Sequence, residues 1–383
     1  MVQSPEQRFP EMLLFAASRD QRHYFQQLAL SVKLPISVAW YKGLWAAPLG
    51  PAPDQAWLAQ QVDLLVRRKR NTAAGQKRSE WFWHLFATWN RWRIAMLYRM
   101  YIAWLKRQPA HYVGVWNGKK LRQAIMVAAA RALGRQVLFF ETGPLPGYSA
   151  LECWGVDAAS GLSREGAFYR RYSGCRLQAP VSTSADNAGL PQGYVFVPFQ
   201  VVEDSNIYFH SPHLRNMREL FDWLVQAVEK RPNLHIVIKL HPGCPEDYRD
   251  LYAAHPRIRF VEDMDTRQLI HAARAVVTIN STVGMEALQA GKPLVVLGDA
   301  IYRIEGLVQT ATSVNELIEA LDSIDKGWKP DEAVREGYLC YLQNVYALPG
   351  DAMKAPDTAH FQAVESRLRA IMERGCREAL ELT

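Results

Sequence analysis

The sequence predicts an α/β protein with two domains, each built around a doubly wound parallel sheet. The chain has 383 residues, of which 49% are apolar, and this is enough for two hydrophobic cores. In both halves, short apolar runs alternate with helix-like stretches, which indicates strand–helix–strand units. A small, polar, proline-containing segment, Ala179–Gly193, separates the two series and predicts an interdomain linker. Sheets of this kind bind ligands beyond the carboxyl ends of their strands.

The first domain is predicted over residues 1–185. A strand in Met12–Ala17, a helix near Gln21–Val32 and a strand in "PISVAWY" form its first βαβ unit. A helical insertion over about 55–107 follows, with helices near Gln55–Arg70 and Glu80–Arg107. Two further strands, "YVGVW" and "QVLFFE", flank a helix through "LRQAIMVAAARAL".

The second domain is predicted over residues 193–345. Its strands are expected in the apolar runs "YVFVPF", "HIVIKL", "IRFV", "AVVTI" and "PLVVLG". The helices between them are expected near Leu214–Lys230, in "TRQLIHAA" and in "GMEALQA". A closing helix near His360–Leu380, within residues 346–383, can pack across both domains.

Charge and cysteine content narrow the setting of the protein. Lys and Arg number 45 against 38 Asp and Glu, and the net charge of +7 fits a phosphorylated ligand or an anionic membrane face without requiring nucleic acid. The five cysteines include no CxxC pair, which predicts free thiols in a reducing compartment. The N-terminus lacks the layout of a signal peptide, and no apolar run is long enough to span a membrane. We therefore expect a cytoplasmic protein.

Four polar clusters follow predicted strands. They are "FFETGPLPGYSALECWGVDAASG" from Glu141, "VPFQVVEDSNIYFHSP" with Gln200 and Asp204, "KLHPG" with Lys239 and His241, and "TINSTVGMEALQAGKPL" with Asn280, Ser281 and Thr282. Each cluster alone is a weak signal, since Ser281 and Thr282 can simply cap a helix and Asp204 can be a turn residue. Because strand ends of one sheet converge, the four together predict a binding site.

These residues carry a family resemblance. The set "FQVVEDSNIYFHSP", "IKLHPG", "VTINSTVGMEALQAGKP" and "GDAIYRIEGL" resembles the capsule polysaccharide synthesis family of bacterial retaining β-Kdo transferases, which use CMP-Kdo. Kdo is 3-deoxy-D-manno-octulosonic acid. The segment from Glu141 resembles the family's first domain, and the branch that starts the Kdo linker on a phospholipid is the most similar. The resemblance covers about Gln136–Gln309.

The resemblance implies a GT-B architecture, in which two Rossmann-like domains face a cleft and the second binds the donor. It implies that Ser281, Thr282 and Gly284 seat the donor phosphate at a helix start, and that His241 stabilises the departing CMP. Lys239 is expected at the phosphate or the sugar carboxylate. The remaining donor-binding residues are Gln200, Asn280 and Glu286, of which Glu286 is expected to accept from the ribose.

Retention of configuration predicts a double displacement with a carboxylate nucleophile. Asp204 is the candidate nucleophile, Gln200 is expected to orient it or the sugar, and Glu141 is expected to activate the acceptor. The donor has one phosphate and no DxD pair follows a strand near its site, so no metal is predicted, and CMP-Kdo enters as a substrate, not as a cofactor. The acceptor is expected to be a phospholipid or other lipid, or a saccharide.

Other functions remain open from the sequence. They are a CMP-sialic acid-type or other nucleotide-sugar transferase of GT-B fold, a nucleotide-sugar epimerase, and a non-catalytic, membrane-associated assembly partner. The stretch Ser79–Arg107 holds five of the twelve tryptophans. It predicts either peripheral contact with the inner membrane or a helix packed on its own domain.

Overall fold

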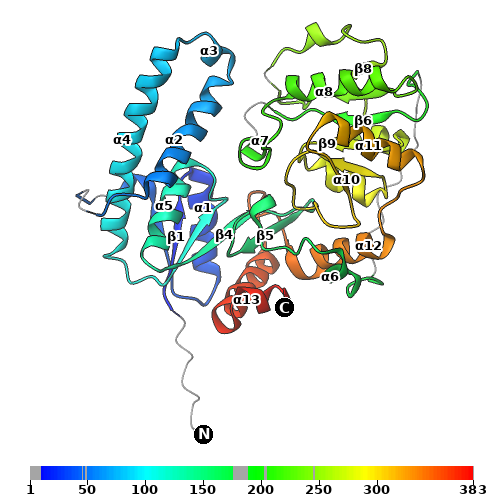
Figure 1. Cartoon of the computed structure of the whole chain (residues 1–383). Helices are drawn as coiled ribbons and strands as arrows, with labels where there is room; N and C mark the ends of the chain where they lie inside the picture. The colour runs from blue at the N-terminus through cyan, green and yellow to red at the C-terminus, as the bar shows by residue number, and fades with distance from the viewer. Residues whose placement is uncertain are drawn as a thin grey trace. The chain divides into compact units, whose positions relative to one another are not determined.

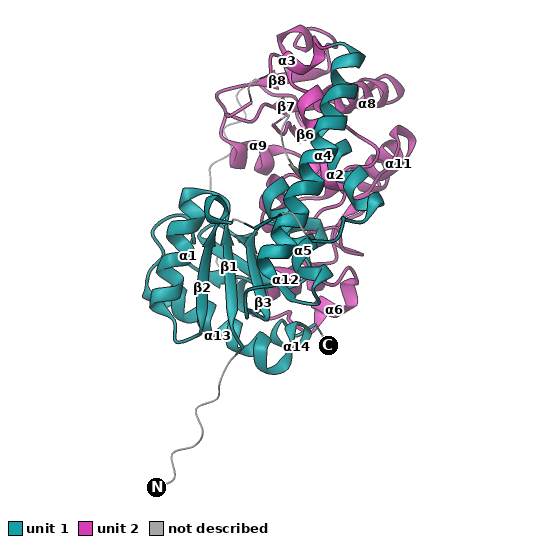
Figure 2. Cartoon of the chain, turned by 90° about the vertical axis from the view of Figure 1, so that its left-hand side faces the viewer, with its two compact units in different colours: residues 1–66, 79–162, 342–383 teal, residues 67–78, 163–341 magenta. Residues whose placement is uncertain are grey.

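A computed structural model of the chain describes residues 10–44, 46–47, 50–175, 189–201, 205–244 and 246–382. Two compact units divide it (Figure 2). Unit 1 comprises residues 1–66, 79–162 and 342–383, and unit 2 comprises residues 67–78 and 163–341. Each unit contains one sheet, and each is described separately below. The predicted linker, Ala179–Gly193, lies largely outside the described residues.

The sheet of unit 1 has the strand order β12-β5-β4-β3-β1-β2 in the described residues (Figure 1). Its strands are β1 (Met12–Ala16), β2 (Ile36–Trp40), β3 (Tyr112–Trp116), β4 (Gln136–Thr142), β5 (Tyr148–Glu152) and β12 (Leu348–Pro349). Strands β1 to β4 pair in parallel, whereas β5 runs antiparallel to both β4 and β12. The chain leaves β1 for β2 on one side and returns to β3 on the other, which places a topological switch point between β1 and β3.

Helices cover both faces of this sheet. They are α1 (Arg19–Ser31), α2 (Gln55–Arg70, whose last four residues belong to unit 2), α4 (Glu80–Leu105), α5 (Leu121–Ala132), α13 (Thr358–Arg374) and α14 (Cys376–Ala379), with short turns η1 (Tyr41–Gly43), η2 (Asp157–Ala159) and η4 (Leu342–Tyr346). Alternate residues of β1 explain the two layers, since Leu13 and Phe15 pack with α4 and α5. Met12 and Leu14 pack with α1 and α13 on the other face. A strand buried on both faces reads as an uninterrupted apolar run, which is why β1 is visible in the sequence.

The sheet of unit 2 has the order β11-β10-β9-β6-β7-β8 in the described residues, and each strand pairs in parallel with its neighbours. Its strands are β6 (Val195–Pro198), β7 (Ile236–Lys239), β8 (Ile258–Val261), β9 (Ala275–Thr278), β10 (Leu294–Val296) and β11 (Gln309–Thr310). Its helices and turns are α3 (Ala73–Gln76), α6 (Gly166–Arg170), α7 (Ser205–His210), α8 (Met217–Lys230), η3 (Arg249–Leu251), α9 (Thr266–Ala272), α10 (Val283–Gln289), α11 (Val314–Asp325) and α12 (Glu332–Tyr341). Both units are therefore doubly wound, and the predicted GT-B class of two Rossmann-like domains is confirmed.

The second unit starts earlier than the linker composition suggests. Helix α6 packs on α12, and Gly337 allows this because a Cβ there would lie 1.9 Å from the Tyr169 carbonyl oxygen. The rings of Tyr169 and Tyr338 meet edge to face, with centroids 5.1 Å apart. Residues from Ser163 onward are thus held by the end of the second unit. The closing helix, in contrast, buries Phe361, Val364 and Leu368 within unit 1.

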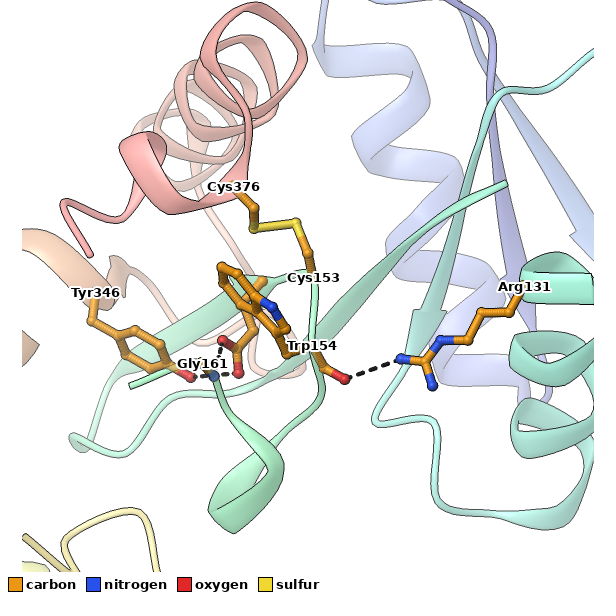
Figure 3. Close-up of a disulfide and its surroundings, with 7 residues drawn as sticks. Arg131, Cys153, Trp154, Gly161, Tyr346 and Cys376 are labelled. Atoms are coloured by element: carbon orange, nitrogen blue, oxygen red, sulfur yellow. Dashed lines mark hydrogen bonds between the residues drawn. A yellow bond between two sulfur atoms is a disulfide. The ribbon is translucent and has the colours of Figure 1, made fainter. Parts of the chain in front are cut away.

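The prediction of free thiols is wrong for four of the five cysteines. Cys153 pairs with Cys376 in unit 1, and Cys175 pairs with Cys340 in unit 2, while Cys244 stays unpaired. The partners are 223 and 165 residues apart, so no local spacing could reveal them. Figure 3 shows the first disulfide next to Trp154, whose carbonyl oxygen accepts from Nη2 of Arg131 at 3.2 Å. This disulfide fastens α14 to the segment that follows β5.

Candidate active site

The polar residues of unit 2 meet at the switch point of its sheet. The chain runs from β6 to β7 and β8 on one side, and then returns to β9, β10 and β11 on the other. Strand β6 is therefore central, paired in parallel with both β7 and β9. Gln200 follows β6, His241 follows β7, and Asn280 follows β9. The carboxyl ends of these three neighbouring strands thus present the predicted residues at one edge, where doubly wound sheets bind ligands.

A pair of buried amides joins the two strands at the switch point. Gln200 Nε2 donates to Asn280 Oδ1 at 3.0 Å, and the backbone N–H of Asn280 donates to Gln200 Oε1 at 3.3 Å. The two side chains are only 4% and 6% exposed. Gln200 uses both ends of its amide on Asn280, which contributes its Oδ1 and its backbone N–H, so these bonds fix both side-chain orientations without burying a charge. We call Gln200 and Asn280 the amide pair.

Asn280 also holds helix α7. Its Nδ2 donates to the carbonyl oxygen of Asn206 at 2.9 Å, with a longer contact of 3.5 Å to that of His210. The chain directly before α7 contains Asp204, the predicted nucleophile, which lies outside the described residues. The residues that follow it are therefore attached to the end of β9 through one asparagine.

The end of β7 presents Lys239 and His241. The Lys239 ammonium donates to the carbonyl oxygen of Met264, in the loop before α9. His241 is exposed, and its Nδ1 accepts the backbone N–H of Gly243 at 3.0 Å. An accepting Nδ1 carries no proton, so the neutral ring must bear its proton on Nε2 and can donate from there. This tautomer suits the predicted contact with a phosphate.

In the turn from β9 into α10, the backbone N–H groups that were predicted to bind a phosphate already bond to other groups of the turn. Ser281 Oγ accepts the N–H of Val283 at 3.2 Å, and the Ser281 carbonyl oxygen accepts the N–H of Gly284 at 3.0 Å. Thr282 is exposed and makes no side-chain cap. The first N–H groups of this seven-residue helix thus have partners, and a phosphate seat here would depend on the Ser281 and Thr282 hydroxyls.

Gly284 has a packing role that the sequence did not reveal. A Cβ at this position would lie 2.4 Å from both Cζ and the hydroxyl oxygen of Tyr302, which is 1% exposed. That hydroxyl donates to the Ser281 carbonyl oxygen at 2.6 Å. The glycine therefore lets Tyr302 reach and hold the turn. Glu286, later in α10, is half-buried, and burial raises its pKa while Arg267 acts in the opposite direction.

Unit 1 has its own polar cluster near its switch point. Glu141 lies near the end of β4, where its carboxylate accepts from Nδ2 of Asn117 and, at 2.9 Å, from the N–H of Thr142. Asn117 follows β3 and adopts a left-handed backbone with φ of 63°. Burial raises the pKa of Glu141 despite these two donors. A carboxyl group with a raised pKa suits proton transfer at neutral pH.

An ion pair supports this cluster. Nζ of Lys119 lies 2.6 Å from Oδ2 of Asp157, and the Lys119 side chain is only 9% exposed. The backbone N–H of Lys119 donates to Asn117 Oδ1 at 3.1 Å. Asn117 and Lys119 were not among the site residues predicted from the sequence. The adjacent Asn-Gly was the available signal, because Asn and Gly tolerate positive φ.

The described residues show neither a metal-binding cluster nor a membrane-spanning helix. In the described ranges, no group of three or more His, Cys, Asp or Glu residues is placed to hold a metal ion. No helix within those same ranges is long and apolar enough to cross a membrane.

The fold and the switch-point residues define a protein of the doubly wound α/β class. Residues 107–346, well over half of the chain, match the family model described as "Capsule polysaccharide biosynthesis protein". The chain belongs to this family. The match includes both the amide pair and the Glu141 cluster.

Curated relatives agree with this assignment. Protein FixF of Sinorhizobium fredii is 36% identical over 252 residues, which cover 64% of this chain and 62% of FixF. The capsule polysaccharide export protein KpsS of Escherichia coli is 36% identical over 129 residues, covering 31% of this chain and 33% of KpsS. The chain thus spans less than two thirds of the length of these relatives.

The solved structures that resemble this chain include the β-Kdo 2,7 transferase of Thermosulfurimonas dismutans KpsC. It is 16% identical, covers 93% of this chain and 98% of its own, and has a TM-score of 0.45.

Proposed function

We propose that the protein is a retaining glycosyltransferase that moves Kdo from CMP-β-Kdo to a lipid or saccharide acceptor in capsule or surface polysaccharide biosynthesis. Membership of the capsule family supports the pathway. The observation that carries the proposal is the amide pair at the switch point, with His241 on the neighbouring strand end. This is where a doubly wound sheet binds a nucleotide.

The donor phosphate is proposed to lie between His241 and the turn before α10. Nε2–H of His241 would donate to a phosphate oxygen and stabilise the charge that develops as CMP departs. The Ser281 hydroxyl keeps its proton for donation, because its oxygen only accepts within the protein. The exposed Thr282 hydroxyl would supply the next donor. Charge-assisted hydrogen bonds of this kind are the stronger ones in proteins.

Three other residues complete the proposed donor site. Lys239 is held at the end of β7 by the Met264 carbonyl, and its two remaining N–H groups would serve the phosphate or the sugar carboxylate. Glu286 would accept from the ribose hydroxyls. Gly284 would act indirectly, since it admits the Tyr302 hydroxyl that holds Ser281.

The proposed chemistry is a double displacement. The Asp204 carboxylate would attack the anomeric carbon, forming a bond to the sugar while the bond from that carbon to the phosphate oxygen breaks and CMP leaves with the electron pair. Glu141, as a carboxylate, would then take the proton of the acceptor hydroxyl, whose oxygen displaces Asp204. Two inversions give net retention. The buried environment that raises the pKa of Glu141 makes its carboxylate the stronger base.

The test is CMP release from CMP-Kdo, with and without acceptor. Asp204→Ala should abolish turnover while CMP binding is retained, and intact mass spectrometry of the wild type should detect the sugar on an aspartate. The combined Ser281→Ala and Thr282→Ala variant should weaken CMP binding instead. Asp250→Ala removes an exposed carboxylate, paired with Arg218 outside the proposed site, and serves as the matched control. Full turnover in Asp204→Ala would overturn the nucleophile assignment.

The same assay separates the alternative functions. Release of CMP from CMP-sialic acid but not from CMP-Kdo would indicate the other donor class. No release from any nucleotide sugar would indicate a non-catalytic assembly partner.

A cytoplasmic location, peripheral on the inner membrane, remains part of the proposal. Family membership supports this location. The cysteines no longer support it, because four of them form disulfides and are not the free thiols of a reducing compartment.

A further inference from the structure

Helix α4 has a second apolar face that the core of unit 1 does not use. One face is buried by residues such as Ile94, Tyr98 and Ile102. The opposite face exposes the side chains of Trp81 (70%), Leu85 (48%), Trp89 (56%) and Trp92 (63%). At about 100° per residue these four lie within an arc of about 80°, and they extend about 16 Å along the helix. We call them the tryptophan ridge.

The ridge is unusual for this molecule. Six large hydrophobic side chains are exposed in the described part of the chain, and four of them form the ridge. A helix on a globular protein normally places polar residues opposite its buried face. A contiguous apolar patch of this kind marks an interaction surface, whereas single exposed residues such as Leu30 do not.

A strongly basic segment precedes the ridge along the chain. Arg67–Arg78 contains six Lys or Arg residues and no acidic residue, and it ends three residues before Trp81. Five of its cations are exposed: Arg67, Lys69, Arg70, Lys77 and Arg78. Within α4, the Arg93 guanidinium lies 5.0 Å from the centroid of the Trp89 ring. Glu80 is the only acidic residue in α4. The cations are thus concentrated in the segment that leads into α4 and do not lie along one face of that helix.

Exposed tryptophans combined with clustered cations are typical of a surface that binds anionic lipid. Tryptophan prefers the boundary between headgroups and acyl chains, where its ring is apolar and its N–H stays hydrated. Clustered Lys and Arg residues are attracted to anionic lipid, by about 1 kcal/mol each near the surface. We propose that the tryptophan ridge and the cations of Arg67–Arg78 dock on a bilayer surface that contains anionic phospholipid. Helix α4 would lie in the interface with its ridge inserted, while its other face stays in the core of unit 1.

The proposal defines which part of Ser79–Arg107 faces lipid, and it does not depend on the donor or on turnover. Trp83, which the sequence places in the same tryptophan-rich stretch, is 5% exposed and belongs to the protein interior. The cations that the proposal needs come from the segment before α4. A loss of activity without a loss of vesicle binding would therefore leave this inference intact.

Vesicle flotation of the full-length protein tests the proposal. Vesicles of phosphatidylethanolamine with phosphatidylglycerol should carry the wild type, and neutral phosphatidylcholine vesicles should carry much less. The combined variant Trp81→Gln, Trp89→Gln and Trp92→Gln should reduce binding to the anionic vesicles by about tenfold or more. Leu30→Gln is the matched control, because it removes an 89% exposed apolar side chain outside the ridge, and its binding should be unchanged.

A charge variant separates the two parts of the surface. Replacing Arg67, Lys69, Arg70, Lys77 and Arg78 with Gln should remove the preference for anionic over neutral vesicles, and raising the salt concentration should weaken wild-type binding. Unfolding temperature and CMP binding confirm that each variant is folded. Equal flotation of the tryptophan variant and the wild type would overturn the proposal. So would a wild type that forms a dimer lost in the tryptophan variant but binds neither kind of vesicle.

Discussion

The two units place different chemistry near the carboxyl ends of parallel strands in similar sheets. At the switch point of unit 2 the central groups are the uncharged amides of Gln200 and Asn280, which bond to each other and, through Asn280 Nδ2, to α7. Near the switch point of unit 1 the central group is a carboxyl, Glu141, whose pKa is raised by burial. A neutral pair keeps its geometry at every pH, whereas a desolvated carboxyl changes charge and can move a proton. Under the proposed function, unit 2 would position the donor and unit 1 would supply the group that changes charge.

The largest expected effect comes from removing the charge in unit 1. Glu141→Gln preserves shape and can still meet Asn117, but it cannot take a proton. Turnover should fall by roughly 10²- to 10⁴-fold, as for the loss of a general base. CMP binding, measured by calorimetry, should stay within a factor of two or so, because the amide pair is untouched. If Glu141→Gln kept wild-type turnover, the assignment of proton transfer to unit 1 would be wrong.

The next effect tests whether packing holds the ligand-positioning turn in unit 2. Gly284→Ala places a Cβ against Tyr302, which is buried and cannot easily move. Overpacking of this kind should lower the free energy of unfolding by about 1–3 kcal/mol, measured by urea denaturation, and should weaken CMP binding.

Gly243→Ala is the control for this change. Gly243 lies on the loop after His241, and the nearest atom to an added Cβ is at 3.4 Å. Its stability should change by less than about 0.5 kcal/mol. A Gly284→Ala variant as stable as this control would show that Tyr302 does not fix the turn.

A smaller effect is expected from the amide pair itself. Gln200→Ala removes the groups that bond Asn280 Oδ1 and its backbone N–H, and Asn280→Ala removes the Oδ1 that accepts from Gln200 Nε2, so each change should reduce stability by about 1–2 kcal/mol. The double variant should be destabilised by less than the sum of the two single changes, because the second change removes the group whose bond the first change already broke. Asn280→Ala should additionally weaken CMP binding, because it also removes the Nδ2 that donates to the Asn206 carbonyl oxygen in α7. Gln200→Ala leaves that bond in place. If the two changes were strictly additive in free energy, Gln200 and Asn280 would not stabilise each other as the amide pair implies.

The sequence predicted the sheets better than the contacts between distant segments. Strands such as β1 and β9 are buried on both faces, and their apolar runs reveal them directly. Strand β5 was missed because "YSALE" carries no clear alternation and forms only by pairing antiparallel with β4. The disulfides and the Tyr302 contact were missed for the same physical reason, since each joins residues whose proximity is created by the fold.

The candidate site was predictable where residues follow strands. Gln200, His241 and Asn280 lie at neighbouring strand ends because parallel strands share one carboxyl edge, and order along the chain is enough to infer this. What each side chain does was not predictable. The use of Ser281 Oγ as an acceptor and the packing of Gly284 on Tyr302 depend on local three-dimensional geometry. The role of Asp204 stays a prediction, since it lies outside the described residues.

The smallest predicted effect is a pH dependence of stability that distinguishes the half-buried carboxyl of Glu141 in unit 1 from an exposed carboxyl in unit 2. Burial raises the pKa of Glu141, so the native state binds this proton more tightly than the unfolded chain does. Its contribution to stability is complete below the ordinary glutamate pKa of 4.5 and is lost as the pH rises through the raised native value. Glu141→Gln should therefore unfold at a higher temperature than the wild type at pH 7, and this advantage should shrink toward pH 4.5.

Glu316 in unit 2 provides the control of opposite sign. Hydrogen bonds from the backbone and then the side chain of Thr312 lower its pKa, so its contribution is present above the ordinary glutamate pKa and is lost as the pH falls through the lowered native value. Glu316→Gln should accordingly unfold at a lower temperature than the wild type at pH 7. Calorimetry at several pH values between 4 and 8 or so measures both variants against the wild type. If the two variants shifted the unfolding temperature in the same direction at pH 7, Glu141 would not be a desolvated carboxyl, and unit 1 would lose its distinction from unit 2.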